Sequence, residues 1–302
     1  MVTDRQSVLI ALAALLLPQA TAHGAGEGNP PQLTDIDQVV MYAIDADTHE
    51  LLRYDFGADE YARIGVVRSP GGIVVPNIES LAMIPRGPHK GLYAVANYHG
   101  ILSARLVMIS VLDATARPAP ALIGFENVEG LVAVEDPDTS QWRLIGSAGS
   151  PGLISIEPDS GAGSLLLATT NRYRGLTLAP DGTLYGITNN ALWTIDRDTG
   201  VETEVTEMDL DARYEALEHA FGDSSPRIKV PSSGATVVPD AWTMGGILFG
   251  YDVEQRRLVI INPADGTMVP WATSLPPLHI EGLAFTTTAR DIIASIVAGA
   301  ID

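Results

Sequence analysis

The stretch Asn127-Val128-Glu129-Gly130-Leu131 is one of five copies of a five-residue phrase that decides the fold. The other copies are Asn77-Ile78-Glu79-Ser80-Leu81, Arg172-Tyr173-Arg174-Gly175-Leu176, Arg213-Tyr214-Glu215-Ala216-Leu217 and His279-Ile280-Glu281-Gly282-Leu283. Each has a polar residue, an apolar residue, Glu (once Arg), a small residue and Leu. The copies start at residues 77, 127, 172, 213 and 279, which are 50, 45, 41 and 66 residues apart. Recurrence at this length indicates a repeat architecture.

Short β-branched and aromatic segments separated by Gly and Asp turns lie between the phrases, as in a β-meander. Residues 175–205 are the clearest unit and read as four antiparallel strands, the content of one propeller blade. The sequence therefore predicts an all-β fold, a single β-propeller of about five four-stranded blades. A sixth blade is the alternative if residues 209–231 form a degenerate unit. A pair of β-sandwiches would not explain the periodic phrase.

The fourth copy in the chain, at residues 213–217, allows two interpretations. Asp209 could cap a helix over residues 209–221, in which Leu210, Tyr214, Leu217 and Phe221 recur at helical spacing. The same residues could instead open a blade. We expect a loop or helix insertion around residues 207–234 in either case.

The two ends of the repeat region are predicted to complete one blade together. The last unit supplies two candidate strands, at 280–285 and 292–297, while residues 41–48 resemble 192–199, the third strand and turn of the clearest unit. Closure of this kind removes exposed sheet edges.

The N-terminal residues resemble an export signal. Residues 8–17 are an apolar run, too short to cross a bilayer as a helix, and residues 20–22 offer a small-residue cleavage site. We expect a signal peptide at 1–22, a flexible lead-in at 23–37 and the propeller at 38–302. The chain has no Cys, which fits a secreted or periplasmic bacterial protein. A retained membrane-tethering N-terminus is the alternative.

Lys and Arg number 18 against 37 Asp and Glu, a formal net charge of −19. This balance disfavours nucleic acid and anionic membranes as partners. We expect a monomer without a transmembrane segment that binds a small molecule or a protein.

The innermost strand of each propeller blade lines the central channel, so a residue at one position in every blade forms a ring. The phrases predict one ring of Glu79, Glu129, Arg174, Glu281 and the less secure Glu215. They predict a second ring of Asn77, Asn127, Arg172, His279 and Arg213. Converging carboxylates repel unless a cation, an Arg or shared protons intervene. Arg174 could balance one or two of them, and Ca²⁺ could balance the rest, which makes Glu79, Glu129 and Glu281 candidate Ca²⁺ ligands. The structural alternative is that each Glu bonds backbone amides of the neighbouring blade.

Candidate ligand-binding residues are Asn77, Asn127, Arg172, Arg174 and His279. His279 is the histidine in a phrase and the candidate proton carrier for catalysis. No nucleophile-elbow, His-Glu-x-x-His or phosphate-loop motif occurs.

Glu129-Gly130-Leu131 and Glu281-Gly282-Leu283-Ala284-Phe285, followed by a Leu-Tyr strand, resemble blade openings of bacterial propellers. These are the esterase-like phytase, gluconolactonase/regucalcin and NHL-type groups. In the gluconolactonase group an opening Glu, with Asn and Asp residues from other blades, holds a divalent metal. The resemblance implies Glu79 or Glu129 with Asn77 or Asn127 as the matching positions, and no counterpart of the Asp stands out. Two functions stay open: an exported propeller that binds a ligand or protein at its channel face, and a Ca²⁺-dependent hydrolase of lactones or phosphate esters.

Overall fold

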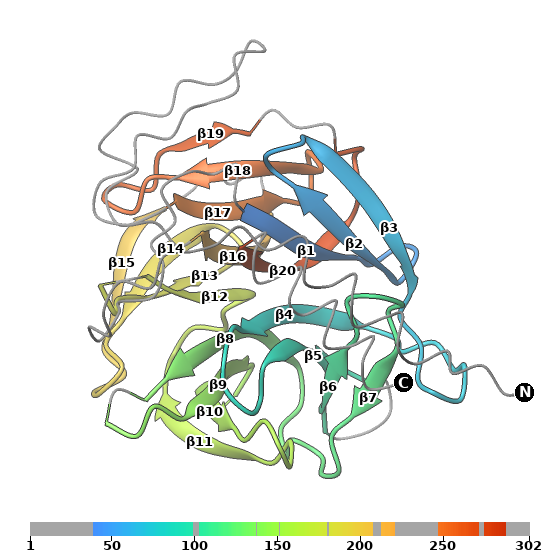
Figure 1. The fold of residues 1–302 in the computed structure, drawn as a ribbon. Helices are drawn as coiled ribbons and strands as arrows, with labels where there is room; N and C mark the ends of the chain where they lie inside the picture. The colour runs from blue at the N-terminus through green and yellow to red at the C-terminus, as the bar shows by residue number, and fades with distance from the viewer. Residues whose placement is uncertain are drawn as a thin grey trace, which may run out of the picture. The chain divides into compact units, whose positions relative to one another are not determined.

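The computed structural model describes residues 39–98, 103–136, 138–150, 152–179, 181–207, 213–220, 247–271 and 275–287. These residues belong to one compact unit, Leu33–Asp302. They form twenty strands in five four-stranded antiparallel sheets, and none of them is helical. The sheets are the blades of a five-bladed β-propeller (Figure 1). In the described ranges, no helix is long and apolar enough to cross a membrane.

Each blade runs from an inner strand to an outer strand in chain order, with one exception described below. The blades are β4 (Ile78–Ile84), β5 (Gly91–Ala96), β6 (Arg105–Ile109) and β7 (Ala116–Pro118); β8 (Val128–Glu135), β9 (Trp142–Ala148), β10 (Gly152–Ile156) and β11 (Gly163–Ala168); β12 (Gly175–Leu178), β13 (Leu184–Ile187), β14 (Ala191–Ile195) and β15 (Glu202–Glu207); β16 (Tyr214–Ala220), β17 (Ile247–Asp252), β18 (Arg257–Ile261) and β19 (Met268–Pro270); and β20 (Ile280–Thr287), β1 (Val39–Asp45), β2 (Glu50–Asp55) and β3 (Glu60–Val66).

All five phrases lie at the start of the inner strands, which confirms the repeat interpretation and five as the number of blades. The inner strands β4, β8, β12, β16 and β20 each contact the next and close a ring around a central axis (Figure 1). The helix interpretation is wrong over Tyr214–Ala220, which is the inner strand β16. Residues 208–212 and 221–246, which hold most of the expected insertion, lie outside the described residues.

The predicted closure of one blade by both ends is confirmed, with one correction. β20 pairs with β1 from Val39↔Thr287 to Asp45↔Ile280. β1 is therefore the second strand of its blade, and its assignment as a third strand was wrong. The resemblance of 41–48 to 192–199 reflects a shared turn: the Asp45 and Asp196 carboxylates both accept hydrogen bonds from amides two residues on. The expected strand at 292–297 lies outside the described residues.

The small residue of the phrase is required because neighbouring inner strands approach each other closely. A Cβ on Gly175 would lie 2.5 Å from the Leu217 backbone nitrogen of β16. Added to Gly282, it would lie 3.0 Å from the Leu81 nitrogen of β4. The small residue of one phrase thus packs against the phrase leucine of the next blade.

Aromatic packing fills the core beside the closing blade. Phe56, Phe249, Trp271 and Phe285 come from the closing blade and its neighbour, and their ring centroids lie 5.3–5.9 Å apart. The same core contains Ile280 and Leu283 of the fifth phrase, so it holds β20 in place along its length.

Candidate functional site

The start of the five inner strands gathers charged residues around one end of the axis. Following the contacts between inner strands, the third phrase position runs Glu79, Glu129, Arg174, Glu215 and Glu281, and returns to Glu79. We call these five residues, with Arg172, Arg213 and His279 before them, the axial cluster.

One half of the axial cluster consists of buried carboxylates held by arginines. Arg174 Nη1 lies 3.6 Å from Glu129 Oε1 and 3.3 Å from Glu215 Oε1, so it links two blades to its own. Arg172 forms a further ion pair with Glu129, and Arg213 with Glu215. These contacts balance the charge of Glu129 and Glu215, which are both buried.

His279 connects this half to Glu281. Its Nε2 atom lies 3.5 Å from Glu215 Oε2 and 3.7 Å from Glu281 Oε1. Its Nδ1 atom lies 3.2 Å from Oδ1 of Asp47, in the turn between β1 and β2. The pKa of Asp47 is lowered, chiefly by the hydrogen bond with His279, so the carboxylate is ionised at neutral pH.

The other half of the axial cluster is acidic and contains Glu79. Asn97, which follows β5, donates to Glu79 Oε2 (2.9 Å) and also exchanges hydrogen bonds with the backbone of Val128 in the next blade. Burial raises the pKa of Glu79 to about 7, and repulsion from Glu129 and Glu281 adds to the rise.

Burial likewise raises the pKa of Glu281 to about 7, and the charge of Glu215 adds to it. His279, Arg213 and Arg174 oppose the shift without cancelling it. Two carboxyl groups at the end of the axis therefore titrate near neutrality, where general acids and bases work.

The remaining predicted residues, Asn77 and Asn127, share a backbone conformation but differ in their side-chain contacts. Asn77 and Asn127 have positive φ angles of 48° and 49°, a conformation that Asn tolerates well. Asn77 donates to the Asn97 carbonyl, and Asn127 is exposed. Both therefore have a clear backbone role at the entry to an inner strand.

The expected Ca²⁺ site at Glu79, Glu129 and Glu281 stays a prediction. Glu129 already pairs with Arg172 and Arg174. The carboxylates also bind side chains of Arg and Asn, where the structural alternative expected backbone amides.

Sequence reasoning missed three polar residues that position the axial cluster: Asp47, Asn97 and Asn189. Asn189 accepts a hydrogen bond from Arg174 Nε. Asn97 and Asn189 both follow the second strand of a blade, β5 and β13, so a search for polar residues at this second repeat position would have found them.

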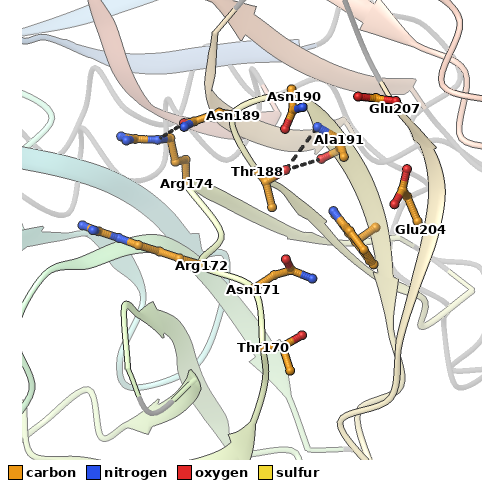
Figure 2. A pocket seen from close by; sticks show the side chains of 11 residues that line it. Thr170, Asn171, Arg172, Arg174, Thr188, Asn189, Asn190, Ala191, Glu204 and Glu207 are labelled. Carbon is orange, nitrogen blue, oxygen red and sulfur yellow. Dashed lines mark hydrogen bonds between the residues drawn. The ribbon is translucent and has the colours of Figure 1, made fainter. Parts of the chain in front are cut away.

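A cavity of about 580 Å³ lies beside the axial cluster, on the blade formed by β12–β15. Figure 2 shows the Arg172 and Arg174 side chains on one side of it and Glu204 and Glu207 on the other. The rest of the lining is mostly polar: Thr170, Asn171, Thr188, Asn189, Asn190, Ala191 and Trp193.

Glu202 holds the segment that carries Arg172. It accepts hydrogen bonds from the amides of Thr170 and Asn171, and from the hydroxyl groups of Thr170 and Tyr173. Although burial raises the pKa of Glu202, these hydrogen bonds outweigh it and the pKa is lowered. The wall of the cavity is thus fixed by an ionised carboxylate.

No protein-family model and no curated protein matches this sequence. Among solved structures, a chain of a nidogen/laminin complex is 13% identical, with a TM-score of 0.49, over 84% of each chain. The PQQ-bound aldose sugar dehydrogenase of Streptomyces coelicolor is 12% identical, with a TM-score of 0.45, over 77% of this chain and 78% of the other. The expected resemblance to propellers holds at the level of fold, which the five blades themselves show.

Proposed function

We propose that this propeller binds a small hydroxylated anion, a carboxylate or a phosphate, at the end of the axis where the phrases begin. The observation that carries the proposal is the exposure of the arginines. The Arg172 and Arg213 side chains are 43% and 44% exposed, whereas their partners Glu129 and Glu215 are 8% and 5% exposed. In a chain of net charge −19, this site therefore presents positive groups to solvent above buried negative ones.

Arginine suits such a ligand because its planar guanidinium binds carboxylate or phosphate through two parallel hydrogen bonds. The adjoining cavity lies within the size range of small-molecule sites. Its Thr hydroxyl and Asn amide groups can donate to and accept from the hydroxyl groups of a ligand. The anionic end would face Arg172 and Arg174, away from Glu204 and Glu207.

Calorimetric titration of the chain with glucuronate, gluconate and glucose 6-phosphate tests the proposal, with neutral glucose as the control ligand. At least one anion is expected to bind and glucose is not. Arg172→Lys should weaken binding about tenfold or more, because Lys keeps the positive charge but cannot donate two parallel hydrogen bonds to the anion. The matched Arg117→Lys, at an exposed position of β7, should leave affinity unchanged. Equal binding of glucose, or binding of no anion, would refute the proposal.

A second candidate function is hydrolysis of a lactone or phosphate ester with the help of a divalent cation such as Ca²⁺. The feature in its favour is that Glu79 and Glu281 are half-buried near other carboxylates, which raises the pKa of each to about 7. A bound cation would polarise the carbonyl or phosphoryl oxygen. The Glu79 carboxylate would take a proton from the attacking water and pass it to the leaving oxygen as the ester bond breaks. Lactone and phosphate-ester turnover, measured with and without Ca²⁺, should be lost in Glu79→Gln while the Tm is retained. Turnover that persists in Glu79→Gln would remove this role.

A further inference from the structure

We infer that Glu215, His279 and Glu281 form a binding site for a divalent transition metal, with Zn²⁺ as the representative ion. Their ligand atoms lie within 4.8 Å of one another, and they come from two adjacent inner strands. This set differs from the Ca²⁺ set that the phrases predict, because it contains an imidazole and replaces Glu79 and Glu129 by Glu215.

The two separations between the imidazole nitrogen and the carboxylate oxygens match a small four-coordinate ion. With metal–ligand bonds of about 2.1 Å, neighbouring ligand atoms of a tetrahedral site are about 3.4 Å apart. His279 Nε2 lies 3.5 Å from Glu215 Oε2 and 3.7 Å from Glu281 Oε1. Three protein ligands would leave the fourth position for water or a ligand oxygen.

Two of the proposed ligand atoms are buried without a hydrogen-bond partner among the described residues, which is independent evidence for the site. Glu215 is only 4% exposed, and its Oε2 atom is buried without a hydrogen-bond partner among the described residues. The His279 Nε2 atom is buried and unpartnered in the same sense. Buried polar atoms normally have partners, and the separation of 3.5 Å between these two is too long for a good hydrogen bond. A metal between them would satisfy both.

The surrounding contacts orient these atoms as they do in metal sites. Asp47 accepts from His279 Nδ1, which leaves the Nε2 lone pair directed at the cluster. Arg213 and Arg174 hold Glu215 through Oε1 and leave Oε2 free. Arg256 in turn lies 3.3 Å from Asp47 Oδ2. Carboxylate–histidine–metal arrangements of this kind raise the basicity of the ligand and fix its ring.

The ligand set also selects among metals. Imidazole nitrogen is a good ligand for Zn²⁺, whereas Ca²⁺ takes six to eight oxygen ligands. We therefore expect Zn²⁺ to bind more tightly than Ca²⁺. This inference does not depend on the proposed anion site, because the metal is measured with no anionic ligand present.

The experiment is a calorimetric titration of the chelator-treated full chain with ZnCl₂, and with CaCl₂ in parallel. One Zn²⁺ per chain is expected, with a rise in Tm and an affinity at least tenfold higher than for Ca²⁺. Co²⁺ should give the visible absorption of a four-coordinate ion. His279→Ala should abolish the tight site, and Asp47→Asn should weaken it about tenfold or more.

His89→Ala is the matched control. The His89 side chain is as exposed as that of His279, 25% in each case, and it also contacts a carboxylate, Asp159 at 2.9 Å. Among the described residues, His89 does not belong to any group of three side chains that could hold a metal ion, so this variant should keep the Zn²⁺ site. Glu281→Gln provides a second disruption if His279→Ala loses its fold. Absence of stoichiometric Zn²⁺ binding, or equal binding by His279→Ala or Glu281→Gln, would overturn the inference.

Discussion

Arg174 donates a hydrogen bond to Glu215 across the boundary between two blades, with 3.3 Å between Nη1 and Oε1. The same guanidinium lies 3.6 Å from Glu129 on the opposite side. One cation therefore ties three consecutive blades together, at the position where the other four phrases carry Glu.

Replacing Arg174 by Ala should destabilise the fold by about 2 kcal/mol or more, because two buried carboxylates lose a partner. Chemical denaturation at neutral pH measures the loss. Arg86→Ala is the matched control, since Arg86 pairs with Glu135 at a surface where it is 52% exposed. Its cost should stay below about 1 kcal/mol. Equal costs for the two variants would show that the link between blades contributes nothing special.

Glu79 should make stability fall as pH rises from about 4.5 to 7. The pKa of Glu79 is about 7 in the folded chain and 4.5 at its ordinary value. Between these two pH values Glu79 is ionised in the unfolded chain and protonated in the folded chain, so a rise in pH favours unfolding. The stabilisation is complete below pH 4.5 and lost above 7, on the order of 1–2 kcal/mol after allowance for solvent screening.

Glu79→Gln isolates this effect, because Gln cannot titrate and its oxygen can still accept from Asn97. Free energies of unfolding measured in chelator at pH 4.5 and 7.5 should show a smaller decline for the variant than for the parent chain. Parallel pH profiles would mean that Glu79 titrates near its ordinary value in the folded chain.

Gly175→Ala should destabilise the propeller by about 1–3 kcal/mol, because the added methyl group meets the Leu217 backbone at 2.5 Å. Gly71→Ala is the control: the nearest atom there is 3.8 Å away and φ is not positive. Thermal unfolding of both variants checks the difference. A neutral Gly175→Ala would contradict close packing of the inner strands.

Glu202→Ala should cost about 1–3 kcal/mol and also weaken anion binding, since the segment carrying Arg172 loses four hydrogen bonds. Because its folded pKa is lowered, the contribution of Glu202 is present above its ordinary value and is lost as pH falls through the folded value. Titration with the best anion and denaturation at pH 7 test both effects, with the exposed Glu254→Ala as control. Unchanged affinity in a destabilised Glu202→Ala would confine its role to stability.

The inner strands and their shared opening could be predicted because the phrase repeats a steric requirement. Gly175 and Gly282 lie where the phrase leucine of the next inner strand packs closely against them, which leaves no room for a Cβ atom. The helix error at Tyr214 and Leu217 arose because β16 is buried at four successive residues, 214–217, and so lacks the alternation that marks a half-exposed strand.

The partners within the axial cluster were less accessible to sequence reasoning. Asp47 reaches His279 only because β1 pairs with β20, a contact between residues more than 200 positions apart. Asn97 crosses to Val128 through the geometry of a loop. Such contacts depend on where blades meet, and no local pattern of residue types encodes that.

Because β20 pairs with β1, the closing blade can form only after nearly all of the described chain has been synthesised. A ribosome makes Asp47 early and His279 and Glu281 late, so four blades can form while the ring is still open. The cluster around His279 assembles only when β20 docks, and its formation carries the entropic cost of closing the longest loop in the described chain. Any ion or ligand that binds only to the assembled cluster would stabilise the closed ring by mass action.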